Sequence, residues 1–97
     1  MIRGTTATHT FTVPFDVSTI DALSVAYSQN GKLKVRKTKD DCVLKNNTIS
    51  VTLSQHDTLM FTDSQVSIQL KVSRSGVVMA SKIVMIPVDR CLDCEVL

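Results

Sequence analysis

The sequence predicts an all-β protein: an immunoglobulin-like β-sandwich of about seven short antiparallel strands with one or two short helical turns. Three observations support this prediction. Thirty of the 97 residues are β-branched, and stretches rich in Ala, Leu and Glu, which build long helices, are missing. Apolar and polar residues alternate along most of the chain, and turn-forming residues interrupt the alternation at short intervals. The length suits one domain, so we expect a β-sandwich over residues 1–90 and a C-terminal tail over residues 91–97.

The first half of the chain predicts four strands. They are expected at residues 7–13, 23–28, 32–37 and 42–44, with a short helical turn at residues 16–21. In the first strand the apolar side chains share one parity and Thr8, Thr10 and Thr12 share the other, so one face is expected to be buried. Asn30-Gly31 supplies two residues that accept positive φ, and therefore predicts a tight hairpin between the second and third strands.

The second half predicts two more hairpins. Strands are expected at residues 48–53, 66–73 and 77–88. The turns at Lys45-Asn46-Asn47 and Ser75-Gly76 close these hairpins. Between them, Ser54 and Asp57 have the spacing of a capping box, which predicts one or two helical turns.

The last strand differs from the others because both of its parities are apolar. One parity holds Val77, Met79, Ile83 and Met85, and the other holds Val78, Ala80, Val84, Ile86 and Val88. One interpretation is a bulge near Ser81-Lys82 that swaps the parity, or a central strand covered on both faces. The other is a subunit interface, whose candidate residues are Val78, Val84, Ile86 and Val88.

Charge and hydropathy exclude several kinds of partner. The formal net charge is +2 and aromatic residues make up 4% of the chain, so neither a broad positive field nor stacking platforms for nucleic acid are expected. Lys32, Lys34, Arg36, Lys37 and Lys39 are interpreted as a solvated strand face.

The longest apolar stretch, residues 77–88, is interrupted and too short to cross a membrane, and the first twelve residues do not resemble a secretory signal. Three cysteines, an odd number, favour a reducing compartment, and we expect the chain to stay in the cytoplasm where it is made.

Residues suited to chemistry are few. Cys91 and Cys94 have a metal-like spacing, but structural zinc needs four ligands, and His9 and His56 would complete a site only if folding brought both to the tail. The sequence contains no nucleophile elbow and no glycine-rich phosphate loop, and the acidic residues fall in turns and helix starts. We therefore expect no catalytic residue, no metal, no cofactor and no small-molecule substrate.

The order of motifs along the chain resembles a family of small proteins encoded in phages and prophages of Firmicutes and related gut bacteria. The resemblance spans nearly the whole chain, and its motifs are structural. They are Arg3-Gly4-Thr5-Thr6, Thr10-Phe11-Thr12-Val13-Pro14-Phe15-Asp16, Tyr27-Ser28-Gln29-Asn30-Gly31, Asp40-Asp41-Cys42, residues 47–55, residues 66–72 and Ala80-Ser81-Lys82-Ile83. In layout the chain is also similar to the N-terminal immunoglobulin-like domain of phage baseplate upper proteins.

The resemblance implies a non-enzymatic component of a phage or prophage virion. Such a protein would act in the tail, the baseplate or at the capsid as a small protein–protein interaction or assembly module, after assembly in the bacterial cytoplasm. The expected partners are other virion proteins, with a homo-oligomer as a further option. The alternative is a small phage-encoded host-interaction or regulatory binding protein that is not incorporated in the particle.

Overall fold

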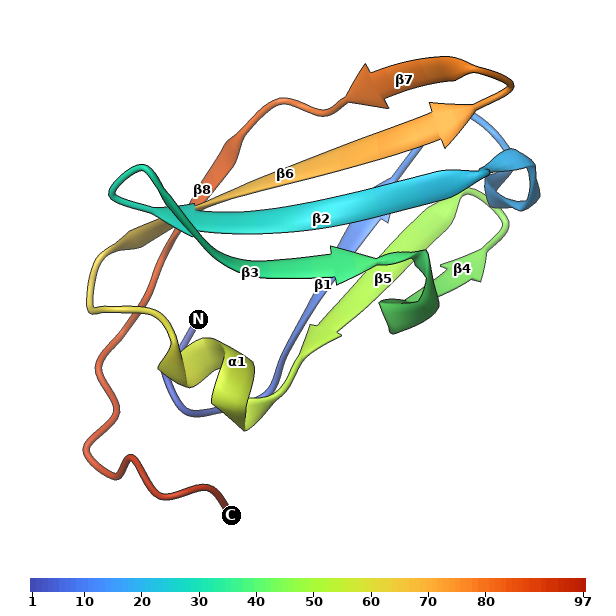
Figure 1. The fold of residues 1–97 in the computed structure, drawn as a ribbon. Helices are drawn as coiled ribbons and strands as arrows, with labels where there is room; N and C mark the ends of the chain where they lie inside the picture. Colours follow the sequence, from blue (N-terminus) through green and yellow to red (C-terminus); the bar gives the residue numbers. More distant parts are fainter.

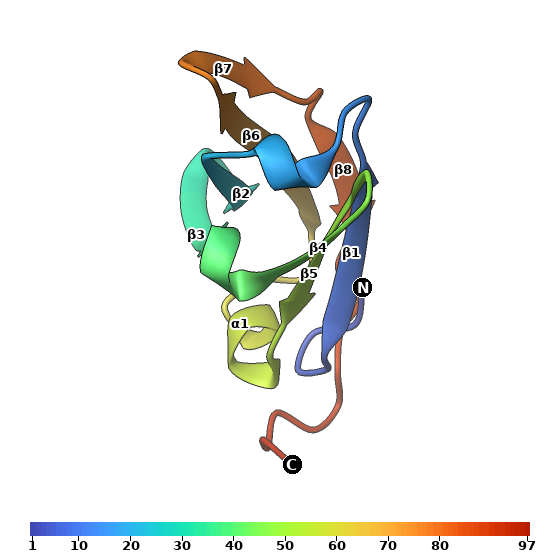
Figure 2. The same ribbon diagram turned by 90° about the vertical axis from the view of Figure 1, so that its right-hand side faces the viewer.

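The computed structural model describes all 97 residues and shows two antiparallel sheets packed face to face (Figures 1 and 2). The smaller sheet has the order β1-β5-β4, with β1 at Ala7–Thr12, β4 at Cys42–Lys45 and β5 at Thr48–Leu53. The larger sheet has the order β3-β2-β6-β7, with β2 at Ala22–Gln29, β3 at Lys32–Thr38, β6 at Gln65–Arg74 and β7 at Val77–Ala80. β8 (Val84–Pro87) pairs with β6 along the same edge as β7. The predicted all-β sandwich is confirmed.

Three short helical segments carry the chain between the two sheets. η1 (Val17–Thr19) leads from β1 to β2, η2 (Lys39–Asp41) from β3 to β4, and α1 (Gln55–Leu59) from β5 to β6. The capping box predicted at Ser54 is present: the Ser54 hydroxyl accepts from the Asp57 amide at 3.1 Å, and Asp57 accepts from the Ser54 amide at 2.9 Å. η2 was not among the helical turns predicted from the sequence.

The strand order departs from that of an immunoglobulin constant domain in one respect. There the second strand belongs to the sheet of the first, fourth and fifth strands, whereas here β2 lies between β3 and β6. The physical reason is the turn at Asn30 and Gly31, whose φ values are 52° and 75°. A two-residue turn cannot cross the roughly 10 Å between packed sheets, so β2 and β3 must pair in one sheet.

The core lies between the two sheets and is built by the inward parity of the central strands. Its sixteen buried apolar residues are Val13, Val17, Ile20, Leu23, Val25, Tyr27, Val35, Ile49, Val51, Leu53, Phe61, Val66, Ile68, Leu70, Val72 and Val88. β5 contributes Ile49, Val51 and Leu53, while Thr48, Ser50 and Thr52 point away from the core. In β3 the pairing shifts at Lys34, so that Leu33 lies opposite Ser28 on the outer face and is exposed.

Candidate interaction surface

The two strands β7 and β8, which lie on one edge of the larger sheet, contain only apolar residues, and Ser81-Lys82-Ile83 connects them. β7 reads Val-Val-Met-Ala and β8 reads Val-Met-Ile-Pro, and both pair with β6 on one side only. All four residues of β7 are exposed, and so are Ile83, Val84 and Met85. Exposed apolar edge strands of this kind are a feature that soluble monomers normally avoid.

A one-residue bulge separates β7 from β8 and reverses which parity faces the core. Ala80 lies opposite Lys71 and Val84 lies opposite Ile68, so three residues of this strand span two residues of β6. Ser81 holds the bulge, because its amide donates to the Leu70 carbonyl at 2.8 Å and its hydroxyl accepts from the Leu70 amide at 3.0 Å. The bulge that the sequence offered as one interpretation is therefore present, and its position is Ser81–Ile83.

The bulge places the four candidate interface residues in different surroundings. Val78 lies opposite Ser73 on the outer face and is 59% exposed. Val84 and Ile86 lie opposite the buried Ile68 and Val66, on the core side; Val84 is 49% exposed and Ile86 packs against the core. Val88 is only 5% exposed and belongs to the core. The structure therefore brings Val78 and Val84 to the surface of the edge and uses Val88 inside the chain.

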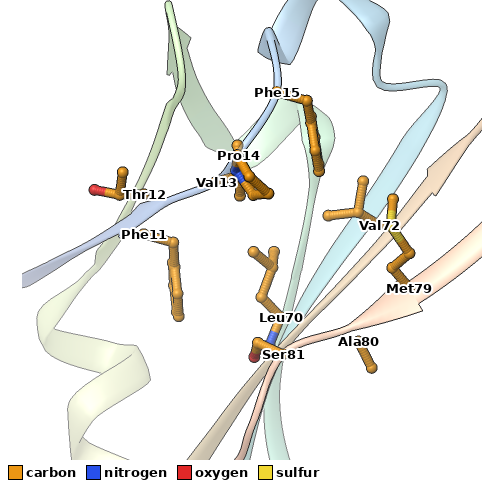
Figure 3. Close-up of a pocket in the computed structure, with 10 residues that line it drawn as sticks. All are labelled: Phe11, Thr12, Val13, Pro14, Phe15, Leu70, Val72, Met79, Ala80 and Ser81. Atoms are coloured by element: carbon orange, nitrogen blue, oxygen red, sulfur yellow. Dashed lines mark hydrogen bonds between the residues drawn. The ribbon is translucent and has the colours of Figure 1, made fainter.

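An apolar pocket of about 240 Å³ opens beside this edge, between β1 and β7 (Figure 3). Its lining residues are Phe11, Thr12, Val13, Pro14, Phe15, Leu70, Val72, Met79, Ala80 and Ser81. β1 and β7 are edge strands of different sheets, so the pocket lies on the open side of the sandwich. Figure 3 shows Phe11 towards one side of it and Met79 towards the other. Sequence reasoning missed the pocket, because no local pattern reveals which two edges meet.

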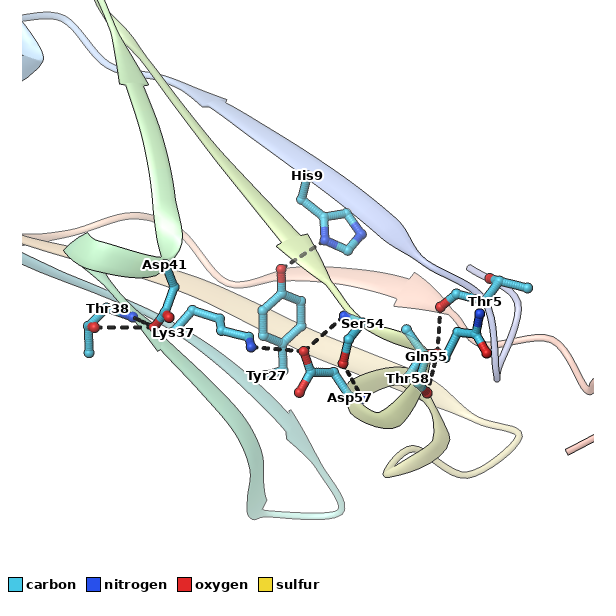
Figure 4. A network of polar contacts seen from close by, with 10 residues as sticks. All are labelled: Thr5, His9, Tyr27, Lys37, Thr38, Asp41, Ser54, Gln55, Asp57 and Thr58. Atoms are coloured by element: carbon cyan, nitrogen blue, oxygen red, sulfur yellow. Dashed lines mark hydrogen bonds and ion pairs between the residues drawn. The ribbon is translucent and has the colours of Figure 1, made fainter. Parts of the chain in front are cut away.

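Several polar side chains form hydrogen bonds and an ion pair that hold elements of the fold together (Figure 4). His9 Nδ1 lies 2.8 Å from the Tyr27 hydroxyl, and burial raises the pKa of that phenol while it lowers the pKa of His9. Lys37 Nζ lies 2.8 Å from Asp57 Oδ2. Partial burial opposes ionisation of Asp57, but hydrogen bonds from Lys37 and Ser54 outweigh it and lower the pKa of this carboxyl. These contacts connect the two sheets and α1.

The three cysteines are free thiols and lie in two regions. Cys42 is half-buried at the start of β4, where burial raises its pKa and keeps the thiol protonated. In the tail, the Cys91 thiol donates to the Asp93 carbonyl, and Cys94 Sγ lies 4.0 Å from an Arg3 nitrogen. His9 contacts Tyr27 and His56 lies in α1, and no group of three or more His, Cys, Asp or Glu residues is placed to hold a metal ion.

The basic residues of β3 and η2 lie at the opposite edge of the larger sheet from β7. Lys37 pairs with Asp57, and Lys39 donates to the Ile20 carbonyl at 3.0 Å. Arg36 and Lys71 line a hollow on the outer face of this sheet together with Val78. None of the helices is long and apolar enough to span a membrane.

Searches of protein families, curated proteins and solved structures found no match to this chain.

Proposed function

We propose that this chain is a non-enzymatic assembly module of a phage or prophage particle, which joins other virion proteins in a tail, baseplate or capsid-associated position. The observation that carries the proposal is the apolar edge of β7 and β8, with Val77, Val78, Met79, Ile83, Val84 and Met85 exposed. Covering this edge by another protein would remove apolar surface from water and pair the unpaired backbone of the strand.

Two further observations support a binding role over a chemical one. The ionisable groups with shifted pKa values contact one another as structural pairs or cap helices, and they do not gather around the pocket. The sequence also resembles small phage and prophage proteins along nearly its whole length. Assembly would take place in the bacterial cytoplasm, and the mature location would be the virion.

The test is whether the chain is present in purified particles. A prophage that carries the gene is induced, its particles are purified by density gradient, and the chain is quantified by mass spectrometry. Val78→Lys, at an exposed site of the apolar edge, is compared with Val43→Lys, because Val43 is 69% exposed on the edge strand β4 of the other sheet. We expect the parent and Val43→Lys to copurify with particles and Val78→Lys to be depleted.

Absence of the parent chain from the particles, while it is abundant in the lysate, would contradict the proposal. It would favour the alternative of a host-interaction or regulatory protein made during infection. Equal incorporation of both variants would show that this edge does not carry the attachment.

A further inference from the structure

We propose that the hollow on the outer face of the larger sheet binds a doubly charged phosphate group, that of a small phosphate monoester, between Arg36 of β3 and Lys71 of β6. The inference goes beyond the proposed function and does not depend on it, because it requires no partner protein.

The larger sheet carries positive charge without negative charge. Its five strands contain six basic residues, four in β3 and two in β6, and no acidic residue. All nine acidic residues of the chain lie outside these strands. A face with charge of one sign attracts ligands of the opposite sign, so an anion is the complementary ligand for this sheet.

Two of the six basic residues, Arg36 and Lys71, line the hollow, and both are exposed. The only ion pair of the chain joins Lys37 to Asp57, so neither Arg36 nor Lys71 has a carboxylate partner. Asp21, which directly precedes the lining residues of β2, accepts from a backbone amide of the turn after β6. The hollow is therefore bordered by two positive charges that nothing in the chain compensates.

The strand register brings both cations to the same hollow. Arg36 lies opposite Ala26 and Lys71 lies opposite Ser24, on the two neighbours of β2. With strands about 4.8 Å apart and residues about 3.4 Å apart along a strand, the two Cα atoms are separated by roughly 12 Å. Between them β2 contributes Ala22 and Ser24, whose short side chains leave the hollow open.

The donors of the hollow belong to three adjacent strands, which suits a tetrahedral anion. Arg36 is on β3, Lys71 is on β6, and the Ser24 hydroxyl is on β2 between them. A phosphate monoester has three free oxygens that accept in different directions, whereas the two oxygens of a carboxylate lie in one plane. A phosphate dianion also balances both positive charges, and a carboxylate balances one.

The volume of the hollow leaves room for a small organic group on the phosphate. The hollow measures about 300 Å³. At about 30 Å³ for each atom of the size of a water molecule, the five heavy atoms of a phosphate group fill roughly half of it. The exposed side chain of Val78 forms part of the remaining wall, so a short apolar or aromatic group would contact it.

An NMR titration of the isotope-labelled chain at low ionic strength tests the site with matched ligands. At about pH 7.5 phenyl phosphate is a tetrahedral dianion, phenyl sulfate a tetrahedral monoanion and benzoate a planar monoanion. Phenyl phosphate should shift the amides of Ser24, Arg36 and Lys71 saturably, with a dissociation constant on the order of 1 mM because the site is open to solvent. The two monoanions should bind at least about tenfold more weakly. Inorganic phosphate should shift the same amides and bind more weakly than phenyl phosphate.

Four variants test the residues of the site. Arg36→Gln and Lys71→Gln each remove one positive charge and should raise the dissociation constant of phenyl phosphate at least about tenfold. Arg36→Lys keeps the charge but loses the planar fork, so it should weaken binding less than Arg36→Gln. Lys45→Gln removes the same charge from β4 of the other sheet and should leave binding unchanged. Thermal unfolding checks that each variant is folded.

Several results would overturn the proposal. They are the absence of a saturable shift with phenyl phosphate, shifts confined to another surface, equal binding of phenyl sulfate or benzoate, and equal weakening by Lys45→Gln. None of these results bears on the presence of the chain in purified particles, so the phosphate site and the proposed function can fail independently.

Discussion

At the scale of single residues, the buried polar side-chain atoms of this sandwich all have hydrogen-bond partners. Gln29, 2% exposed at the end of β2, donates to the Thr62 carbonyl at 3.1 Å and accepts from the Thr62 amide at 2.8 Å. Its amide thereby holds the loop that leads into β6. Thr58 is fully buried, and its hydroxyl donates to the Thr5 carbonyl at 2.7 Å and accepts from the Gly4 amide at 3.0 Å. Such groups favour one folded arrangement over others, because a buried polar group without a hydrogen-bond partner costs free energy.

Stability is expected to fall on mild acidification because of His9. Burial, and secondarily the positive charge of the N-terminus, lowers the pKa of His9 in the folded chain, while the unfolded chain binds the proton near pH 6.5. Below about pH 6.5 the unfolded state therefore binds more protons, and the free energy of unfolding decreases until the pH passes the folded pKa. Urea titrations from pH 8 downward measure this slope. His9→Gln should remove it and His56→Gln should keep it; an unchanged slope in His9→Gln would assign the effect to other groups.

At the scale of elements, the bulge at Ser81–Ile83 decides the role of the last strand. Without it, Val84, Ile86 and Val88 would share a face with Val78 and point to solvent. With it, Ile86 lies opposite the fully buried Val66, and Met85 lies opposite Ser67 on the outer face. The same change of face occurs at Lys34 in β3, where it turns Leu33 outward. One extra residue in a strand is enough to exchange its two faces.

Two neighbouring lysine substitutions test this assignment. Ile86→Lys is expected to lower the free energy of unfolding by about 2 kcal/mol or more, because it removes an aliphatic side chain from the core and brings a charge to its border. Met85→Lys should change it by less than about 0.5 kcal/mol, because Met85 is exposed on the outer face. Equilibrium unfolding in urea measures both. The reverse order of the two effects would mean that the strand continues through Lys82 without a change of face.

At the scale of the whole molecule, the two sheets are joined along one side by the N-terminal residues. The Arg3 amide donates to the Asp89 carbonyl at 3.0 Å, the Asp89 amide donates to the Met1 carbonyl at 2.7 Å, and Ile2 forms a parallel bridge with Asp89. The Arg3 guanidinium also donates to the carbonyls of Leu59 and Phe61 at the end of α1. These contacts close one end of the open side of the sandwich. The pocket between β1 and β7 occupies the other end (Figures 1 and 3).

The tail is expected to add little to the stability of the whole. Residues 91–97 have no regular secondary structure, and their link to α1 is the exposed pair of hydrogen bonds between Gln55 and Leu97. Replacing Cys91 and Cys94 by Ser should therefore change the free energy of unfolding by less than about 0.5 kcal/mol. Urea unfolding with a zinc measurement on the same samples checks this. Stoichiometric zinc that disappears from the double variant together with stability would contradict it.

The strands and turns of this protein are predictable from its sequence, because their signals are local. Alternation in residues 7–13, 48–53 and 66–73 sets strands with one buried face, and Asn30-Gly31 and the Ser54 capping box set a turn and a helix start within a few residues. It also singled out the last strand as unusual. The packing of the two sheets was needed to show that β2 lies between β3 and β6, that Ser81–Ile83 is a bulge and that Val88 is buried while Val78 is exposed. Strand partners and one-residue shifts of register depend on contacts between residues far apart in the chain, and no local period encodes them.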